Sequence, residues 1–179
     1  DEGLDTGDLL GQRSVAIAKG EHAPALLARL SVEGAALLVA TLDGLGHGSI
    51  VPQPQDHKRA TSAPILTREH GSWDPAWTAR ELEGRVRGFD PWPGVWAARG
   101  GKRLRIAGAA ALTDASSTEV PGAVLSSDAL WVRVACAGGT VAVVDAVQPE
   151  GGRVMGAREA VNGRLLGPGD RFERPEPAA

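Results

Sequence analysis

The stretch between His47 and Gly71, HGSIVPQPQDHKRATSAPILTREHG, constrains the fold most, because it interrupts every regular pattern in the chain. It contains three prolines and many polar residues, and it has neither a helical nor an alternating period. A proline drives the residue before it out of the helical conformation, so such a segment runs extended between folded parts. It therefore predicts a linker between an N-terminal and a C-terminal part.

The N-terminal part has apolar residues at helical spacing. The pattern predicts a short strand at Val15–Ile17 and then a helix that begins near Pro24 and continues to Leu42, where a series of glycines ends it. This part is typical of the closing segment of an α/β domain. The longest apolar run, residues 35–42, is too short to cross a membrane, so no membrane association is expected.

The C-terminal part begins with a helix start signal. Thr78 is followed three residues later by Glu81, which is a capping-box pattern, and Asp90-Pro91 is expected to stop the helix. The period then changes to two, and residues 95–112 and 130–147 each surround a pair of glycines, which indicates two hairpins. Several short antiparallel strands with a packed helix, and a short helix near residues 157–162, predict a small closed barrel.

Composition excludes several classes of site. The single cysteine, Cys136, rules out an intramolecular disulfide framework and a zinc knuckle, and it fits a reducing cytoplasm. No metal site is expected, because the four histidines are scattered without metal-ligand spacing. They are His22, His47, His57 and His70.

The acidic opening, DEGLDTGDLL, fits neither an aspartic-protease motif nor a calcium-binding loop. An aspartic protease needs two copies of Asp-Thr-Gly, and only Asp5-Thr6-Gly7 is present. A calcium loop counted from Asp1 needs glycine at the sixth position and glutamate at the twelfth, which Thr6 and Gln12 occupy. The residues alone therefore leave the role of this segment open.

Charge is divided unevenly along the chain. Residues 1–84 contain seven Lys or Arg against twelve Asp or Glu, whereas residues 85–179 contain twelve against ten. A basic cluster in the second half can attract phosphates, although charge alone favours an ordinary solvated surface, and no aromatic-rich set that would read bases is evident. The cluster consists of Arg85, Arg87, Arg99, Lys102, Arg103 and Arg105.

The segment RVRGFDPWPGVW (85–96) predicts a rigid corner with Trp92 packed on the barrel. It also resembles the Phe-Asn-Pro-Trp-Pro-Gly segment of the methionyl-tRNA formyltransferases, with Asp90 in place of the usual Asn. Four other segments resemble that family in the same order. They are GLDTGD (3–8), the helical run LLARLSVEGAALLVATLDGL with the PQPQ that follows it, ATSAPILTRE (60–69), and RVMGAREAVNGRLLGPGDRF (153–172).

The resemblance implies an enzyme of translation initiation. Members move a formyl group from 10-formyltetrahydrofolate to the amino group of methionine on initiator tRNA. They combine a Rossmann-like catalytic domain with an OB-like barrel that contacts the tRNA. Matched residue by residue, Asp5 is the catalytic aspartate, whereas the Asn-x-His pair and the Ser-Leu-Leu-Pro folate loop are absent from this sequence.

The resemblance therefore implies a fold of class α/β plus β, with the end of a catalytic domain at 1–48, a linker at 49–68, an OB-like tRNA-binding domain at 69–174 and a tail at 175–179. It makes the six basic residues candidate contacts to the tRNA backbone. Two departures from the family pattern bear on this interface: Ile65 replaces a linker lysine, and Asp90 places a negative charge nearby.

The expectation is the C-terminal portion of a cytoplasmic, monomeric enzyme, inactive by itself and, since the chain lacks an initial methionine, cut from a longer protein. Two alternatives stay open. One is a related formyltransferase or hydrolase that acts on a sugar nucleotide or on formyltetrahydrofolate. The other is a short barrel that binds RNA without catalysis.

Overall fold

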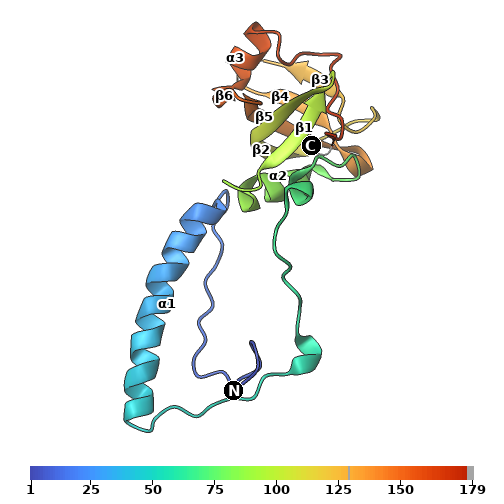
Figure 1. Cartoon of the computed structure of the whole chain (residues 1–179). Coiled ribbons are helices and arrows are strands. Elements are labelled where there is room, and N and C mark those ends of the chain that lie inside the picture. The colour runs from blue at the N-terminus through green and yellow to red at the C-terminus, as the bar shows by residue number, and fades with distance from the viewer. Residues whose placement is uncertain (129, 177–179) are drawn as a thin grey trace. The chain divides into compact units, whose positions relative to one another are not determined.

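The computed structural model describes residues 1–128 and 130–176, and it divides into two compact units (Figure 1). The N-terminal unit is Asp1–Ile65 and the C-terminal unit is Leu66–Ala179. The division lies within the predicted linker. Two short 3₁₀ turns, η1 (His57–Arg59) and η2 (Arg68–Gly71), are the regular structure of that region.

The N-terminal unit is built around one helix, α1 (Ala23–Gly46), which has a proline in its first turn as the sequence predicts. An extended segment before the helix contacts it through two arginines: Arg13 pairs with Glu33, and Arg29 Nη2 donates to the Ala16 carbonyl at 2.8 Å. The predicted strand at Val15–Ile17 is wrong, because these residues have no β-partner. None of the residues of α1 is buried.

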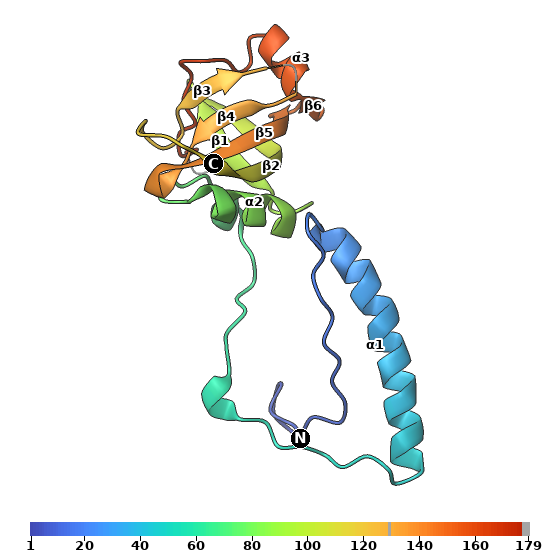
Figure 2. The ribbon, with the colours of Figure 1, turned by 180° about the vertical axis from the view of Figure 1, so that it is seen from behind.

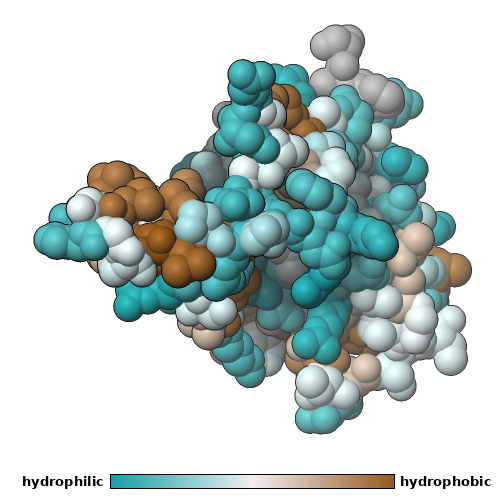
Figure 3. Space-filling model, turned by 90° about the horizontal axis from the view of Figure 1, so that it is seen from below, coloured by the Kyte–Doolittle hydropathy of each residue, from teal (hydrophilic) through white to brown (hydrophobic). Residues whose placement is uncertain are grey.

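Helix α1 also corrects the length argument against membrane insertion. It has 24 residues, and its most apolar 18-residue window has a mean hydropathy of 1.7. Among the described residues it is the one helix long and apolar enough to cross a membrane, although a core helix of a soluble protein meets the same criteria. Figure 3 shows the apolar side chains gathered over this helix.

The C-terminal unit combines a six-stranded sheet with two helices. Its 3₁₀ turn η3 (Ala137–Gly139) joins two of the strands. Its helices are α2 (Ala79–Gly88) and α3 (Ala157–Asn162). Its strands are β1 (Val95–Arg99), β2 (Lys102–Ser116), β3 (Val124–Ser127), β4 (Val132–Ala135), β5 (Thr140–Pro149) and β6 (Met155–Gly156). Figure 2 shows α2 at one end of the sheet and α3 with β6 at the other.

Local sequence signals set most of these elements. The predicted capping box is confirmed, since Thr78 accepts from the Glu81 backbone and the Glu81 carboxylate accepts from the Thr78 backbone. Both predicted glycine hairpins are confirmed as well, as the β1–β2 and β4–β5 pairs. The corner after α2 contains two cis peptide bonds, Asp90–Pro91 and Trp92–Pro93.

All the strand pairs are antiparallel, in the order β1-β2-β5-β4-β3, with β6 pairing β5. Within the described chain β1 does not pair with β3, so the strand order itself is open. Residues 169–173 span this gap. Glu173 exchanges two backbone hydrogen bonds of 2.8 Å with Ala98 of β1, Phe172 N donates to Gly122 O, and Val124 N of β3 donates to Asp170 O.

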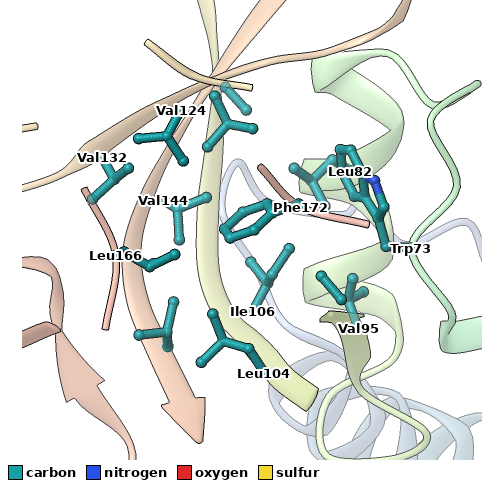
Figure 4. Packing of buried hydrophobic residues seen from close by; sticks show 14 of the residues in the cluster. Trp73, Leu82, Val95, Leu104, Ile106, Val124, Val132, Val144, Leu166 and Phe172 are labelled. Atoms are coloured by element: carbon teal, nitrogen blue, oxygen red, sulfur yellow. The ribbon is translucent and has the colours of Figure 1, made fainter. Parts of the chain in front are cut away.

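The core lies between the sheet, α2 and this C-terminal segment (Figure 4). Trp73 is fully buried and makes edge-to-face contacts with Trp77 and Phe172, at ring-centroid distances of 5.9 and 6.1 Å. Phe172 belongs to the same buried cluster as Ile106 of β2 and Val144 of β5 (Figure 4). The C-terminal segment therefore contributes both hydrogen bonds and a core side chain.

Candidate functional site

Asp5 lies in a turn that several side-chain hydrogen bonds hold. The Asp1 carboxylate accepts from the Gly3 backbone at 3.0 Å and from the Thr6 hydroxyl at 2.7 Å. Gln55 of the linker donates from Nε2 to the carbonyls of Asp5 and Gly7, at 3.1 and 2.7 Å. The linker thus fixes the turn that presents Asp5.

The backbone of Asp5 is in the left-handed region, with a φ of 59°. Aspartate tolerates this conformation better than most residues, and such conformations persist where the surroundings hold them, often at functional sites. The side chain is exposed, and within the described residues its carboxylate has no hydrogen-bond or ion-pair partner. The turn therefore presents a carboxylate that is open to a partner, and it does not form an assembled catalytic site.

Metal coordination finds no support in residues 1–128 and 130–176. These residues contain no group of three or more His, Cys, Asp or Glu side chains that could hold a metal ion. Of the acidic side chains of the opening, Asp1 is the one that accepts turn hydrogen bonds from the described residues.

Five of the six basic residues predicted as nucleic-acid contacts form ion pairs inside the C-terminal unit. The shortest joins Arg99 to Asp170 at 2.8 Å, and the next joins Arg105 to Asp90 at 3.2 Å. Longer pairs join Arg103 to Glu150 at 3.7 Å, and Arg85 and Arg87 to Glu81 and Glu83 at 3.9 Å each. Lys102 makes no ion pair with any described residue.

The strand register decides which of these cations share a face. Arg105 lies opposite Trp96, and Arg103 lies opposite Ala98, so these arginines point away from the buried face of β2. Arg99 and Lys102 meet at the hairpin end, on the other face of the ribbon. Arg85 lies on α2, with its guanidinium 4.3 Å from the centre of the Trp77 ring. The structure thus groups Arg103 with Arg105 on one face and Arg99 with Lys102 on the other, and it places Arg85 and Arg87 apart from both pairs, on α2.

The corner after α2 contradicts the prediction for Trp92. That side chain was expected to pack on the barrel, but 53% of it is exposed. Pro93 and Gly94 take the buried positions of the corner, and Trp73 supplies the core indole. The indole of Trp96 is fixed to the corner by a hydrogen bond, since its Nε1 donates to the Pro93 carbonyl at 3.0 Å.

Trp92 lines a pocket that the sequence analysis missed. Its volume is about 280 Å³, and it is lined by Arg68, Trp92, Pro93, Trp96, Arg103 and Glu150. The alternation of β1 and β2 could have indicated part of it, because it puts Trp96 on the same face as Arg103. The contribution of Arg68 could not be read from the sequence, since Arg68 precedes the corner by more than twenty residues.

Comparisons with known proteins match this fold. The model of the formyl transferase C-terminal domain family matches residues 66–165. A methionyl-tRNA formyltransferase of Acidobacterium capsulatum is 41% identical over 96% of this chain and 55% of its own length. Those of Myxococcus xanthus and Solibacter usitatus are 38% and 43% identical over 96% and 93% of the chain. The chain spans about half the length of these curated relatives.

Among solved structures, a variant of HypX from Aquifex aeolicus is similar, with a TM-score of 0.60. The similarity covers 92% of this chain and 30% of HypX, at 16% sequence identity. At that identity the likeness concerns the fold alone.

Proposed function

Because the chain belongs to the formyl transferase C-terminal domain family, we propose that it is part of an enzyme that formylates methionyl initiator tRNA. The observation that carries this proposal is the similarity to methionyl-tRNA formyltransferases over nearly the whole chain, not only over the C-terminal unit. The formyl donor that we propose is 10-formyltetrahydrofolate. We also propose that the enzyme is cytoplasmic and monomeric.

Residues 1–48 are proposed to end a Rossmann-like catalytic domain. Helix α1 is 24 residues long and strongly apolar, yet it buries none of its residues within this unit. An apolar helix next to an extended segment whose residues 15–17 have no strand partner is what remains when a βα unit lacks its sheet. We accordingly assign the apolar surface of α1 to packing inside that domain and not to a membrane.

Asp5 is proposed as a member of the catalytic set. Formyl transfer passes through a tetrahedral intermediate, which requires proton relays and stabilisation of a developing oxyanion. A carboxylate next to a histidine can hold its charge state and orient a water molecule. The residues around Asp5 in this chain do not form a donor site, because no cation or histidine faces its carboxylate within the described residues. The chain alone is therefore expected to be inactive.

The C-terminal unit is proposed as an OB-like barrel that binds the tRNA backbone. The segment 169–173 supports the barrel reading, since it joins the edges of β1 and β3. Lys102, which forms no ion pair with a described residue, is the most available cation, and the paired arginines Arg85, Arg87, Arg99, Arg103 and Arg105 would exchange carboxylates for phosphates.

The test is a formylation assay on the whole protein that carries this chain, with methionyl initiator tRNA and 10-formyltetrahydrofolate. Formyl-methionyl-tRNA is expected, and Asp5→Asn should lower kcat about 100-fold or more, as for loss of a proton-transfer group. Asp8→Asn is the matched control, because Asp8 is an exposed acid of the same turn.

Three results would contradict the proposal. They are formylation of a sugar nucleotide in place of the tRNA, hydrolysis of the donor without transfer, and RNA binding without any formyl chemistry. Equal activity of Asp5→Asn and Asp8→Asn would remove only the role of Asp5.

A further inference from the structure

We propose that the pocket around Trp92 holds one unpaired nucleotide of the bound RNA, with its base stacked on Trp92 and its phosphate beside Arg103 and Arg68. This inference rests on the proposed RNA-binding function and extends it from the backbone to a base. The pocket lies within the C-terminal unit and is about 280 Å³ in volume.

The exposed indole is the first step of the argument. Trp92 presents more than half of its surface to solvent, whereas Trp73 is fully buried in the same unit. The corner around it is rigid, since two prolines flank the residue and Pro93 and Gly94 are buried. Indole rings provide stacking surfaces for nucleobases, and a rigid ring loses little conformational freedom on binding.

The second step is the arginine on the pocket wall. The Arg103 guanidinium is 5.1 Å from the centre of the Trp96 ring, which orients it, and its ion pair with Glu150 is long, at 3.7 Å. Its Nε is buried and has no hydrogen-bond partner among the described residues. Because that Nε is closed to solvent, a phosphate oxygen would bind the Nη groups of Arg103, in place of the long contact from Nη1 to Glu150.

The third step concerns the rim of the pocket. Arg68 is exposed and makes no ion pair with a described residue, so a second cation is available for the same phosphate. Glu150, which also lines the pocket, is exposed and carries the opposite charge. A carboxylate there disfavours a second anion but accepts a hydrogen bond from a ribose hydroxyl or a base amino group.

These groups select an unpaired nucleotide over a duplex. Inside a duplex both faces of each base stack on neighbouring bases, so an indole has no face to contact, and only the phosphates remain available. A single-stranded end or a flipped base offers one free face together with its own phosphate. The pocket combines one exposed indole with adjacent arginines, which matches that pair of groups.

The experiment compares two RNA hairpins bound by the 179-residue chain, each closed by a non-nucleotide hexaethylene glycol linker so that the loop contains no unpaired base. One ends in a blunt duplex, and the other carries a single unpaired 3′ nucleotide, 2-aminopurine, whose fluorescence falls when it stacks. The overhang is expected to tighten binding about five- to ten-fold, at the lower end of measured base–aromatic stacking because Trp92 stays partly solvated. The 2-aminopurine fluorescence is expected to decrease on binding.

Variants assign the effect to Trp92. Trp92→Ala should remove both the preference for the overhang and the quenching, while the affinity for the blunt hairpin stays unchanged; Trp92→Phe should keep part of both. Val120→Ala is the matched control, because Val120 is 52% exposed and lines a different pocket. Near-ultraviolet circular dichroism checks that each variant keeps its packed core.

The outcomes separate this inference from the proposed function. Equal binding of the two hairpins by the unmodified chain, or an undiminished preference in a folded Trp92→Ala variant, would overturn the pocket assignment and leave backbone binding in place. Failure to bind either hairpin at low salt would instead remove the RNA interface itself, and the pocket assignment with it.

Discussion

The carboxylate of Asp90 lies 3.2 Å from Nη2 of Arg105, on the outer face of the β1–β2 ribbon. Asp90 therefore neutralises one of the cations proposed to bind RNA. Asp90→Asn should release Arg105 and tighten RNA binding about five-fold. It should also steepen the dependence of log affinity on log salt by about 0.7 to 0.9, the contribution of one additional phosphate contact.

A salt titration of RNA binding checks this, with Asp114→Asn as the control for the change in net charge, since Asp114 is exposed on β2. Equal slopes for Asp90→Asn and the unmodified chain would show that Arg105 does not contact phosphate.

For Lys102 the salt dependence of RNA binding is expected to change in the opposite direction on substitution. Lys102 makes no ion pair with a described residue, so none has to be broken before it contacts a phosphate. Lys102→Gln should reduce the salt slope by about 0.7 to 0.9 and weaken binding without changing the preference among RNA sequences. The same titration with Lys58→Gln, a lysine of the other unit, serves as the control. An unchanged slope for Lys102→Gln would remove Lys102 from the interface.

Gly122 is the point where the C-terminal segment meets the strand edge. Its φ is +93°, and a Cβ at this position would lie 2.2 Å from the Phe172 carbonyl oxygen. Gly122→Ala should therefore destabilise the C-terminal unit by about 1 to 3 kcal/mol. Urea unfolding followed by tryptophan fluorescence measures this unit alone, since all five tryptophans lie in it.

Gly167→Ala is the matched control for that substitution. Its added methyl meets no atom within 4 Å and its backbone is not left-handed, so the free energy of unfolding should stay the same or rise slightly. A Gly122→Ala variant as stable as Gly167→Ala would contradict the closure seen between Gly122 and Phe172.

Glu81 makes the stability of the C-terminal unit sensitive to acid. The Thr78 backbone N–H, followed by the Thr78 hydroxyl, donates to the Glu81 carboxylate and holds its pKa below the ordinary value of 4.5. The unfolded chain binds this proton more readily, so the contribution is complete above about pH 4.5 and is lost as the pH falls through the lower folded pKa.

Glu81→Gln should therefore flatten the decline in stability between about pH 5 and pH 3, which urea unfolding at several pH values would show. Glu119→Gln, at an exposed carboxylate that is not part of a helix cap, is the control. If the free energy of unfolding fell equally steeply with decreasing pH in Glu81→Gln and in the unmodified chain, this contribution would be excluded.

Cys136 should behave as an inert core residue. It is 1% exposed, and burial raises the pKa of its thiol to about 11, so little thiolate exists at neutral pH. A thiol reagent should modify Cys136 only as fast as the C-terminal unit unfolds, and the labelling rate should increase in Gly122→Ala. Rapid labelling of the native chain would contradict the observed burial.

The sequence predicts those parts of the fold that local interactions determine. The Thr78 cap and the two glycine hairpins follow from residues a few positions apart, and the structure confirms them. The strand at Val15–Ile17 fails because a strand depends on a partner that local sequence does not show. The closure through Phe172 joins residues fifty positions apart, which no periodicity reveals.

The same distinction applies to the candidate sites. The position of Asp5 in a turn is visible from its neighbours, but Gln55, which holds that turn, lies fifty residues later. The proline corner is visible as a corner, but which of its side chains faces solvent depends on the residues that fill the core, above all Trp73.

The place of Phe172 in the core also has a consequence for the order of events during synthesis. Its packing partner Trp73 emerges from the ribosome about a hundred residues earlier, and β1 emerges well before the segment that hydrogen-bonds its edge. Contacts over such separations form late, because the loop between them must close first. The nascent C-terminal unit therefore displays an open sheet edge and an unfilled core until its last segment arrives, and this is the interval in which chaperones would find it.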